Sequence, residues 1–457
     1  MPDSANNTHT AHATSAENTT SATGATSVPC TTSAASTDNT ASATSVPSAT
    51  STTSTNPLFS FTDEERAYLQ QVSQENEQHL SPYATRHSQA IFEYPEQADD
   101  DSDLVRPAFV RDVDRVLNNA FYNRCMDKTQ VFPFYKNDDL TRRSFHLQLV
   151  SQTARKIGMA LRLNTALIEA IALGHDMGHT PFGHGGEYIL NDLSREHTGR
   201  CFNHNVHSVR LLRTVAQRNL SLQTFNGMLC HCGEKAFLEY HPQPCPDFAT
   251  LENMMERCYL EPGHSQNLRP STLEGCVVRI CDILAYLGKD RQDALSIGVL
   301  DNQSYYVYDN VLGSTNWEFI RNASANLIKC SMQRDCLAMD EEVFEAISSI
   351  KQLNEQTIYQ SPQAHETLDL YIAPMMARLY ERFLEDVKAG DESSYIYRHH
   401  INAWMMKDNK DYCNQPPDDI VIDYLASMTD EYFVDLHNRL FPQQAVSPDT
   451  LFVAYFK

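Results

Sequence analysis

The segment from Gly174 to Glu187 concentrates side chains that can bind a metal or transfer a proton. Within thirteen residues it holds His175, Asp176, His179, His184 and Glu187. Adjacent His175 and Asp176 offer a divalent metal one nitrogen and one oxygen. His146 lies 29 residues before this pair and Asp282 lies 106 residues after it. Mixed imidazole and carboxylate ligation suits a transition metal such as Mn, Fe, Ni or Co better than Ca or Mg. We therefore predict a metal enzyme.

Three apolar runs with helical spacing are expected to position these four ligands. The first begins at His146 and extends to residue 161, and the second covers 167–174 and ends directly before His175. The third covers 273–294 and carries Asp282, with Tyr286 and Asp290 one and two turns further along. Helix breakers are expected to end the second run, at Gly178, Pro181, Gly183, Gly185 and Gly186.

A histidine on an apolar helix face is, taken alone, more often a hydrogen-bonded core residue than a ligand. The whole arrangement favours a metal, because a buried ionised Asp176 or Asp282 is costly without a cation to pair it. The Cys230-His231-Cys232 cluster has no second half at zinc-finger spacing, so a structural zinc is not expected there. The twelve cysteines form no paired framework, and we expect reduced thiols.

Ordered sequence blocks make the chain similar to a known family. They are Leu80–Arg86, Arg106-Pro107 with Phe109, Arg111, Asp112, Arg115 and Phe121, Lys128–Phe132, Arg143 before His146, Gly174–Glu187, Phe202–Asn205 with Ser208, Asp282–Tyr286 and Asp423–Asp430. Together they resemble the dGTPase-like deoxynucleoside triphosphate triphosphohydrolases of the HD superfamily, over about residues 65–440. Leu149, Lys289 and Ser427 depart from the family pattern, which leaves substrate preference open.

The resemblance implies an all-α fold, an HD-domain helical fold with additional helices and a helical C-terminal region. Residues 59–457 are expected to form this domain, with an HD core at about 140–295 and the C-terminal helical region at about 310–457. Residues 1–58 are expected to be a disordered tail, because positions 1–56 are mostly Ser, Thr, Ala and Asn and contain no Lys or Arg.

The resemblance also implies the reaction and the residues that perform it. A divalent metal (Mn, Mg, Fe, Ni or Co) is expected on His146, His175, Asp176 and Asp282, where it would acidify a bound water toward a pKa of ~7. Attack at the α-phosphorus would release deoxynucleoside and inorganic triphosphate. His184 and Glu187 match the catalytic pair, in which Glu187 orients His184 for proton transfer. The residues expected to bind substrate are Arg143, His179, His204, Tyr286 and Asp290.

Charge and hydropathy restrict the partners. A net charge of −23 argues against generic nucleic-acid binding, and duplex nucleic acid is not expected as the main partner. Positive charge is local and precedes His146, at Arg106, Arg111, Arg115, Arg124, Lys128, Arg142 and Arg143, where it could neutralise a polyphosphate. Arg142 is expected to be solvated instead, whereas Arg143, one helical turn before His146, is expected to point into the pocket with a guanidinium that matches phosphate oxygens. No stretch approaches the ~18 apolar residues of a membrane span, so we expect a cytoplasmic protein without a membrane partner.

Two other classes of function stay open. One is an HD-type phosphodiesterase or 5′-nucleotidase acting on nucleoside monophosphates or cyclic nucleotides, which would need neither the His184/Glu187 pair nor the basic segment. The other is a noncatalytic nucleotide-sensing module, which intact ligands disfavour. The resemblance further suggests a homo-oligomer and an activating nucleotide.

Overall fold

Helices make up the fold of the computed structural model, which describes residues 60–96, 102–232, 236–301, 311–359, 362–403, 406 and 409–454. The α-helices are α1 (Asp63–Gln78), α2 (Ser102–Val105), α3 (Ala108–Leu117), α4 (Ala120–Arg124), α5 (Arg143–Leu161), α6 (Thr165–Gly174), α7 (Gly183–Thr198), α8 (His204–Arg210), α9 (Leu222–Cys230), α10 (Phe248–Leu260), α11 (Leu273–Ser296), α13 (Asn316–Ser331), α14 (Glu341–Asn354), α15 (Pro362–Thr367), α16 (Ala373–Ala389), α17 (Pro417–Ala426), α18 (Asp430–Leu440) and α19 (Pro448–Leu451). The predicted disordered tail lies outside the described residues.

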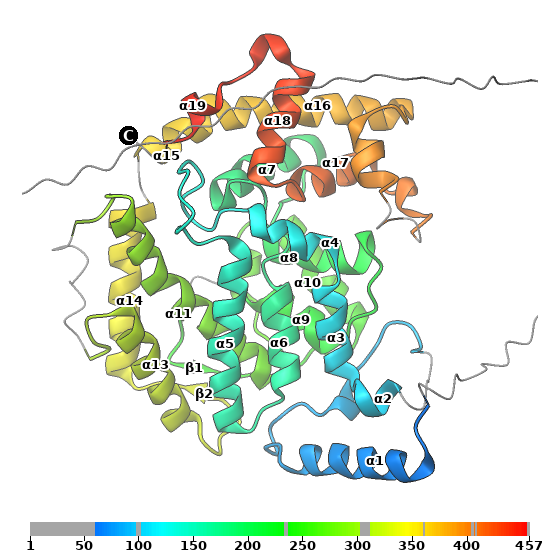
Figure 1. The fold of residues 1–457 in the computed structure, drawn as a ribbon, viewed down its shortest axis with the longest axis vertical. Coiled ribbons are helices and arrows are strands. Elements are labelled where there is room, and N and C mark those ends of the chain that lie inside the picture. Colours follow the sequence, from blue (N-terminus) through cyan, green and yellow to red (C-terminus); the bar gives the residue numbers. More distant parts are fainter. Residues whose placement is uncertain are drawn as a thin grey trace, which may run out of the picture. The chain divides into compact units, whose positions relative to one another are not determined.

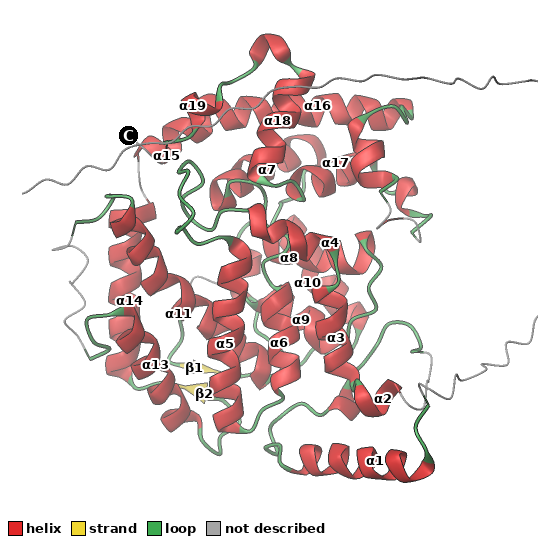
Figure 2. Cartoon of the chain, viewed as in Figure 1, coloured by secondary structure: helices red, strands yellow, loops and turns green. Residues whose placement is uncertain are grey.

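Shorter elements connect these helices. The 3-10 turns are η1 (His87–Gln89), η2 (Cys125–Asp127), η4 (His264–Asn267), η9 (Tyr412–Asn414) and η10 (Pro442–Gln444), and the π-helical turns are η3 (Leu211–Val215), η5 (Glu355–Tyr359), η6 (Leu368–Ile372) and η7 (Tyr397–Ile401). Strands β1 (Glu239–Tyr240) and β2 (Leu337–Ala338) pair antiparallel, with Glu239 opposite Ala338. They are the only sheet among the described residues, so the predicted all-α class is confirmed (Figure 2).

The centre of the fold is a packed group of helices that includes the three predicted from sequence. Helices α5 and α6 lie side by side, α3 packs on α6, and α11 packs against α5, α6 and α9 (Figure 1). Helix α6 is almost wholly apolar and buried, and α11 is buried along most of its length. Helices α13 and α14 cover α11 from another side. A ligand carried at an end or in the middle of these helices is therefore held by packing on several sides.

Side-chain caps fix where the central helices begin. The Asn164 side chain accepts hydrogen bonds from the backbone N–H groups of Ala166 and Leu167 at the start of α6. Thr272 caps α11 through the N–H of Gly275. Such caps satisfy N–H groups that have no partner within the helix. Because each start is fixed, the rotational position of His175 after α6 and of Asp282 within α11 is fixed as well.

A second group of helices lies over α7. Helices α16 and α17 pack against each other, and both contact α7 (Figure 1). Their apolar side chains join those of α8 and α9 in one large core, which includes Leu190, Met375, Leu379 and Tyr424. Among the described residues, no helix is both long and apolar enough to cross a membrane.

Candidate active site

The four predicted metal ligands meet where α5, α6 and α11 come together. His146 lies in the first turn of α5, His175 and Asp176 directly follow α6, and Asp282 lies within α11. His146 Nε2 is 2.9 Å from Asp282 Oδ1, and His175 Nε2 is 3.6 Å from both Asp282 Oδ1 and Asp176 Oδ1. His146, His175 and Asp176 are buried. Three separate segments thus bring the four predicted ligands close together, and their role as metal ligands stays a prediction.

The protonation of His175 shows that this cluster suits a cation. Its Nδ1 is 2.8 Å from the carbonyl oxygen of Ala172, which can only accept, so Nδ1 carries the proton. The opposite nitrogen, Nε2, is buried without a hydrogen-bond partner. A lone pair there faces the carboxylate oxygens of Asp176 and Asp282, an unfavourable arrangement unless positive charge lies between them. Two imidazoles and two carboxylates fit a divalent transition metal.

The charges of the cluster point the same way. Burial disfavours a charged imidazole, yet the carboxylates of Asp176 and Asp282 raise the pKa of His175, so they draw positive charge, as a proton or as a metal cation, to Nε2. Burial likewise disfavours the charged form of Asp176, but His179, His175 and Arg143 hold its pKa well below the usual value. The pKa of Asp282 is also lowered despite burial, by the hydrogen bond with His146 and the nearby imidazole of His175. Both carboxylates are therefore ionised and attract positive charge.

A second group of histidines surrounds Glu187 in the first turn of α7. Glu187 Oε2 lies 3.1 Å from His184 Nδ1 and Oε1 lies 2.9 Å from His204 Nδ1. Glu187 Oε1 also accepts the backbone N–H of His204 at 2.8 Å. His204 and His179 are buried and stack with ring centroids 3.8 Å apart, whereas 59% of the His184 side chain is exposed. His184 is thus oriented by Glu187 through one nitrogen while its ring faces solvent.

The start of α7 has an unusual backbone that distant residues hold in place. Phe182 has φ of +63° and Gly183 has φ of +58°, and a non-glycine residue rarely adopts such values without external support. The N–H of Phe182 donates to Asp430 Oδ1 at 2.9 Å, and Asp430 Oδ2 accepts the N–H of Thr129 at 3.1 Å. The sequence predicts that Gly183, Gly185 and Gly186 break the helix, but α7 begins at Gly183 and continues through Gly185 and Gly186.

Two further contacts fix the loop between α6 and α7. The buried Lys128 ammonium donates to the carbonyl oxygens of His179 and Ala426, the latter at 2.8 Å. Burial lowers the pKa of Lys128 to about 8. At Gly178 a Cβ atom would lie 2.3 Å from the backbone of both His204 and Ser208, so only glycine lets the loop approach α8 this closely. The backbone around His179 is therefore positioned by segments far apart in sequence.

The basic segment before His146 is mostly paired with protein groups. Arg106 Nη2 lies 2.6 Å from Asp114, and Glu96 receives Arg111 Nε at 3.2 Å and Arg115 Nη2 at 2.7 Å. These three arginines are therefore already paired with carboxylates and do not form a group of unpaired positive charges. The sequence alone shows a cluster of arginines in this segment. It does not show that Asp114 and Glu96 pair with them, because these contacts form only in the folded chain.

Arg143, the arginine expected to point toward the metal ligands, does so. Its Nη1 lies 2.5 Å from Asp176 Oδ2, and its Nη2 donates to the carbonyl oxygens of Thr129 and Gln130 at 3.3 and 3.4 Å. The side chain is buried. Arg143 is thus bound to a predicted metal ligand in addition to lying beside the site.

The two residues predicted to bind the sugar continue along α11 from Asp282. Asp290 is buried, and its Oδ2 accepts a hydrogen bond of 2.8 Å from the Tyr359 hydroxyl. Burial raises the pKa of Asp290 to about 8, and neighbouring Asp293 adds to the effect. Tyr286 is half-buried against the apolar core that α11 shares with α5 and α13. Tyr286 and Asp290 follow Asp282 by one and two helical turns, so all three side chains lie along the same side of α11.

Sequence reasoning missed His231 as a member of the site. It directly follows α9, as His175 follows α6, and each ring donates Nδ1 to the carbonyl three residues earlier, here Met228 at 2.6 Å. His231 Nε2 lies 3.4 Å from Asp176 Oδ1. The Cys230-His231-Cys232 cluster does not match zinc-finger spacing, and that comparison gives no sign of this contact. The available signal was a histidine that ends an apolar run in the same way as His175.

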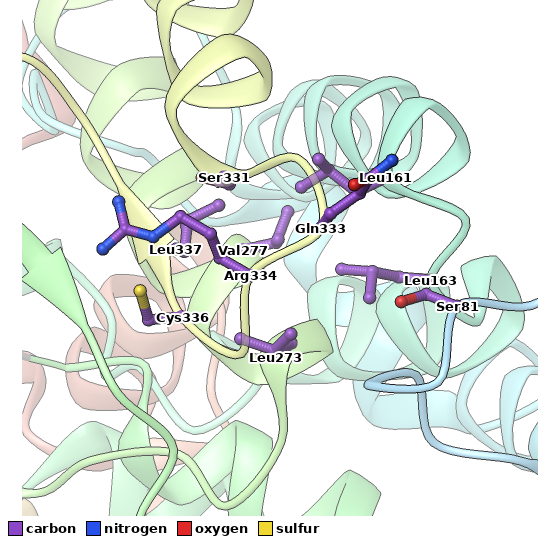
Figure 3. A pocket seen from close by; sticks show the side chains of 10 residues that line it. All are labelled: Ser81, Leu161, Leu163, Leu273, Val277, Ser331, Gln333, Arg334, Cys336 and Leu337. Carbon is purple, nitrogen blue, oxygen red and sulfur yellow. The ribbon is translucent and has the colours of Figure 1, made fainter.

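A small pocket elsewhere in the molecule does not belong to this site. It is lined by Leu161, Leu163, Leu273, Val277 and Arg334 among others (Figure 3). Leu161 ends α5 and His146 lies in its first turn, so at ~1.5 Å per residue the two lie roughly 20 Å apart. No predicted site residue lines this pocket.

Comparison with known proteins agrees with this geometry. The HD domain family model matches residues 143–287, and a phosphohydrolase-associated domain matches residues 337–439. Three bacterial relatives carry the description deoxyguanosinetriphosphate triphosphohydrolase-like protein. The relative from Desulfatibacillum aliphaticivorans is 28% identical over 74% of this chain and 88% of its own length. The relative from Caldanaerobacter subterraneus subsp. tengcongensis is 29% identical over 79% and 92%.

The third relative, from Brucella canis, is 30% identical over 74% of this chain and 90% of its own length. The matched HD domain contains all four predicted metal ligands and the His184/Glu187 pair. The chain therefore belongs to the deoxyguanosinetriphosphate triphosphohydrolase-like family and is an HD-domain phosphohydrolase.

Proposed function

We propose that the protein hydrolyses deoxynucleoside triphosphates, dGTP or dNTPs generally, to deoxynucleoside and inorganic triphosphate in a metal-dependent reaction. The observation that carries this proposal is the exposed His184, oriented by half-buried Glu187, beside the His146/His175/Asp176/Asp282 cluster. A simple HD phosphohydrolase needs the cluster alone, whereas the pair supplies proton transfer. The descriptions of the relatives name a dGTP triphosphohydrolase-like protein, which supports the same substrate class.

A divalent cation on the four ligands would polarise a phosphoryl oxygen and acidify water for attack. In the proposed reaction, the oxygen of water bonds to the α-phosphorus and the bond from that phosphorus to the 5′-oxygen breaks. The departing deoxynucleoside needs a proton on its 5′-oxygen, and the attacking water must lose one. A single imidazole near both oxygens can exchange these protons, a contribution of ~10²- to 10⁴-fold.

His184 has the geometry for this exchange. Its Nδ1 faces the Glu187 carboxylate, which can only accept, so Nδ1 carries a proton and Nε2 is left for the reacting atoms. Burial disfavours an ionised Glu187, yet His204 and His184 hold its pKa well below the usual value. Glu187 therefore stays anionic and keeps the tautomer of His184 fixed, as an orienting carboxylate does.

Substrate contacts are proposed for five residues around these groups. Arg143, His179 and His204 lie beside Asp176 and Glu187, where they would contact the phosphates. Tyr286 and Asp290 lie along α11, where they would meet the deoxyribose. Burial and the neighbouring Arg143 and His204 hold the pKa of His179 well below its usual value, so it would meet a phosphate as a neutral donor. A homo-oligomer and an activating nucleotide stay predictions from the family resemblance.

A product assay tests the proposal. The purified full chain is incubated with each of the four canonical dNTPs in Mn or Mg, and the products are separated by ion-exchange chromatography. Deoxynucleoside and inorganic triphosphate in equal amounts are expected. Orthophosphate, or activity only on a monophosphate or cyclic nucleotide, would instead identify an HD phosphodiesterase or nucleotidase. No product with any substrate would favour a noncatalytic nucleotide sensor.

A further inference from the structure

Three side chains of different ligand types meet at the pair of strands β1 and β2, outside the candidate active site. The strands run antiparallel, with Tyr240 opposite Leu337. Extending this register by one residue places His241 opposite Cys336, and Glu239 lies two residues before His241 on the same face of the strand. The carboxylate, imidazole and thiol donor atoms of these three residues all lie within 4.8 Å of one another.

Arg334 holds the Glu239 carboxylate in place. Its Nη2 lies 2.6 Å from Glu239 Oε1, and its Nη1 donates to the carbonyl oxygen of Cys330 at 3.1 Å. The second carboxylate oxygen, Oε2, is 3.0 Å from His241 Nε2. One oxygen is thus bound by the guanidinium while the other faces the imidazole. Outer partners of this kind orient a carboxylate that binds a metal.

A surface ion pair alone does not account for the position of the thiol. The side chains of Glu239 and His241 are 42% and 60% exposed, and exposed pairs contribute little to stability. Cys336 is buried beside them. A thiol is only a weak hydrogen-bond donor, so it gains little from these neighbours in the absence of an ion. Thiolate, imidazole and carboxylate are, however, the three kinds of side chain that bind zinc.

We propose that Glu239, His241 and Cys336 bind a zinc-like divalent cation that connects β1 to β2. A thiolate together with an imidazole selects an ion such as Zn²⁺ or Co²⁺ over Mg²⁺. Zinc binds histidine nitrogen at ~2.0–2.1 Å and thiolate sulfur at ~2.3 Å in tetrahedral sites, which places neighbouring ligand atoms about 3.3–3.6 Å apart. The exposed side chains of Glu239 and His241 can reach these separations by small rotations, and water completes the fourth position.

Binding of the ion changes where the protons lie. Without an ion, His241 Nε2 carries the proton, because the Glu239 carboxylate that it faces can only accept. The cation takes the place of this proton, and the ring is then protonated at Nδ1. The Cys336 thiol releases its proton to solvent, since the thiolate is the form that binds a metal. The two negative charges of the thiolate and the carboxylate balance the charge of the cation.

The ion would join the two matched domains. Strand β1 lies within the HD domain match at 143–287, and β2 begins the phosphohydrolase-associated domain match at 337–439. Cys336 also lines the small pocket of Figure 3 beside Leu161, which lies at the opposite end of α5 from His146. Because two of the three ligand side chains are exposed, the ion exchanges with solvent and stays bound only while zinc or cobalt is supplied. The inference does not depend on which nucleotide is hydrolysed.

Cobalt titration of the full chain tests the inference. The protein is freed of metal with a chelator, titrated with Co²⁺ and followed by absorption spectroscopy, with Asp176→Ala, which should not bind the active-site ion, titrated in parallel. Both proteins should develop a near-ultraviolet thiolate-to-cobalt charge-transfer band as one equivalent binds, and added Zn²⁺ should remove it. In the Asp176→Ala background, Cys336→Ser should lose this band. His241→Ala should weaken cobalt binding by more than the ~10- to 100-fold that losing an outer-shell partner costs.

The matched control is Cys330→Ser, which removes a half-buried thiol on α13 whose Sγ lies 3.8 Å from Asn326 Oδ1, and it should keep the band. A missing thiolate band in Asp176→Ala would overturn the inference, as would a band of unchanged intensity in Cys336→Ser or unchanged cobalt affinity in His241→Ala. If Asp176→Ala shows the band and the unmodified protein binds no further ion, the inference stands and the metal site of the proposed function fails.

Discussion

Arg143 Nη1 lies 2.5 Å from Asp176 Oδ2, and both side chains are buried. The guanidinium therefore orients one oxygen of Asp176 and leaves the other, Oδ1, facing His175, His179 and His231. An arginine that was expected to hold phosphate thus also acts on a metal ligand. Partners of this kind set the direction in which a carboxylate presents its oxygens to a metal.

Replacing Arg143 should weaken metal binding. Arg143→Lys keeps the charge but loses the planar fork that reaches both Asp176 and the carbonyl oxygens of Thr129 and Gln130. We expect the affinity for Mn²⁺ to fall ~10- to 100-fold. Isothermal titration calorimetry on metal-free protein measures it, with Arg155→Lys on the outer part of α5 as the control. An unchanged affinity for Mn²⁺ would show that Arg143 does not orient Asp176 for the metal, and would leave it only the proposed contact with the substrate.

Removing a ligand should abolish metal binding and leave the fold intact. Asp176→Ala and His175→Ala each delete one donor of the cluster without touching the apolar faces of α5, α6 and α11. Bound metal by mass spectrometry and turnover should both disappear, while circular dichroism stays helical. The exposed histidine His241 provides the control variant, His241→Ala. Full occupancy and near-normal rate in Asp176→Ala would contradict the ligand assignment.

His184 and Glu187 should act as one unit. His184→Ala should retain metal and bind dNTP with near-normal affinity, yet lose at least the ~10²-fold in turnover typical of acid/base groups. Glu187→Gln should lose somewhat less, and the double variant should be little worse than His184→Ala, because coupled effects do not add. Steady-state kinetics at saturating metal give these values. Release of metal by His184→Ala would make it a ligand and refute the mechanism.

Asp290 should make stability depend on pH. Burial raises its pKa from 3.8 to about 8, so between these values the folded protein holds a proton that the unfolded chain releases. The unfolding free energy should therefore fall as pH rises through this window, by at most ~1.4 kcal/mol per pH unit from this group. Asp290→Asn cannot ionise but can still accept from Tyr359. Urea unfolding measures the unfolding free energy of both proteins from about pH 5 to about pH 8. As the pH increases, the Asp290→Asn variant should become more stable relative to the unmodified protein. A difference that stays constant with pH would contradict the raised pKa of Asp290.

Asp430 should control the start of α7. Asp430→Ala leaves the buried N–H groups of Phe182 and Thr129 without an acceptor, which costs about 1–3 kcal/mol for each. The strained Phe182 backbone then loses its support, so turnover should drop while metal stays bound. Chemical denaturation and metal analysis measure the two effects. Glu431→Gln, at the neighbouring exposed position, should change neither, and an equally stable Asp430→Ala would show that α7 holds its own start.

The sequence was sufficient for features that depend on local periodicity. The apolar spacing beginning at His146, the run ending at Gly174 and the run from Leu273 correspond to α5, α6 and α11. Because a helix fixes the direction of each side chain, the convergence of His146, His175 and Asp282 followed once these helices were expected to pack together. The same periodicity places Cys276 and Cys281 on the apolar side of the third run, and both are buried on α11.

Features that depend on contacts between distant segments were not predictable. Neither the pairing of Arg111 and Arg115 with Glu96 nor the approach of His231 to Asp176 has a local signature, because each is set by how loops cross the helices. The start of α7 was also misjudged, since glycines that disfavour helix are tolerated where tertiary contacts fix the backbone. The sequence pattern predicted metal binding and proton transfer for the segment from Gly174 to Glu187. It did not predict the distant residues, such as Lys128 and Asp430, that hold this segment in place.

The hydrogen bonds from Lys128 to Ala426 and from Phe182 to Asp430 have a consequence for biosynthesis. About 250 residues separate Phe182 from the carboxylate that holds its strained backbone, by the numbering of the chain. During translation, domains order from the amino-terminal side as the chain emerges. The loop between α6 and α7 can therefore be fully fixed only after the ribosome has released α17 and the start of α18. Uptake of metal in the cell should follow completion of the polypeptide rather than accompany its synthesis.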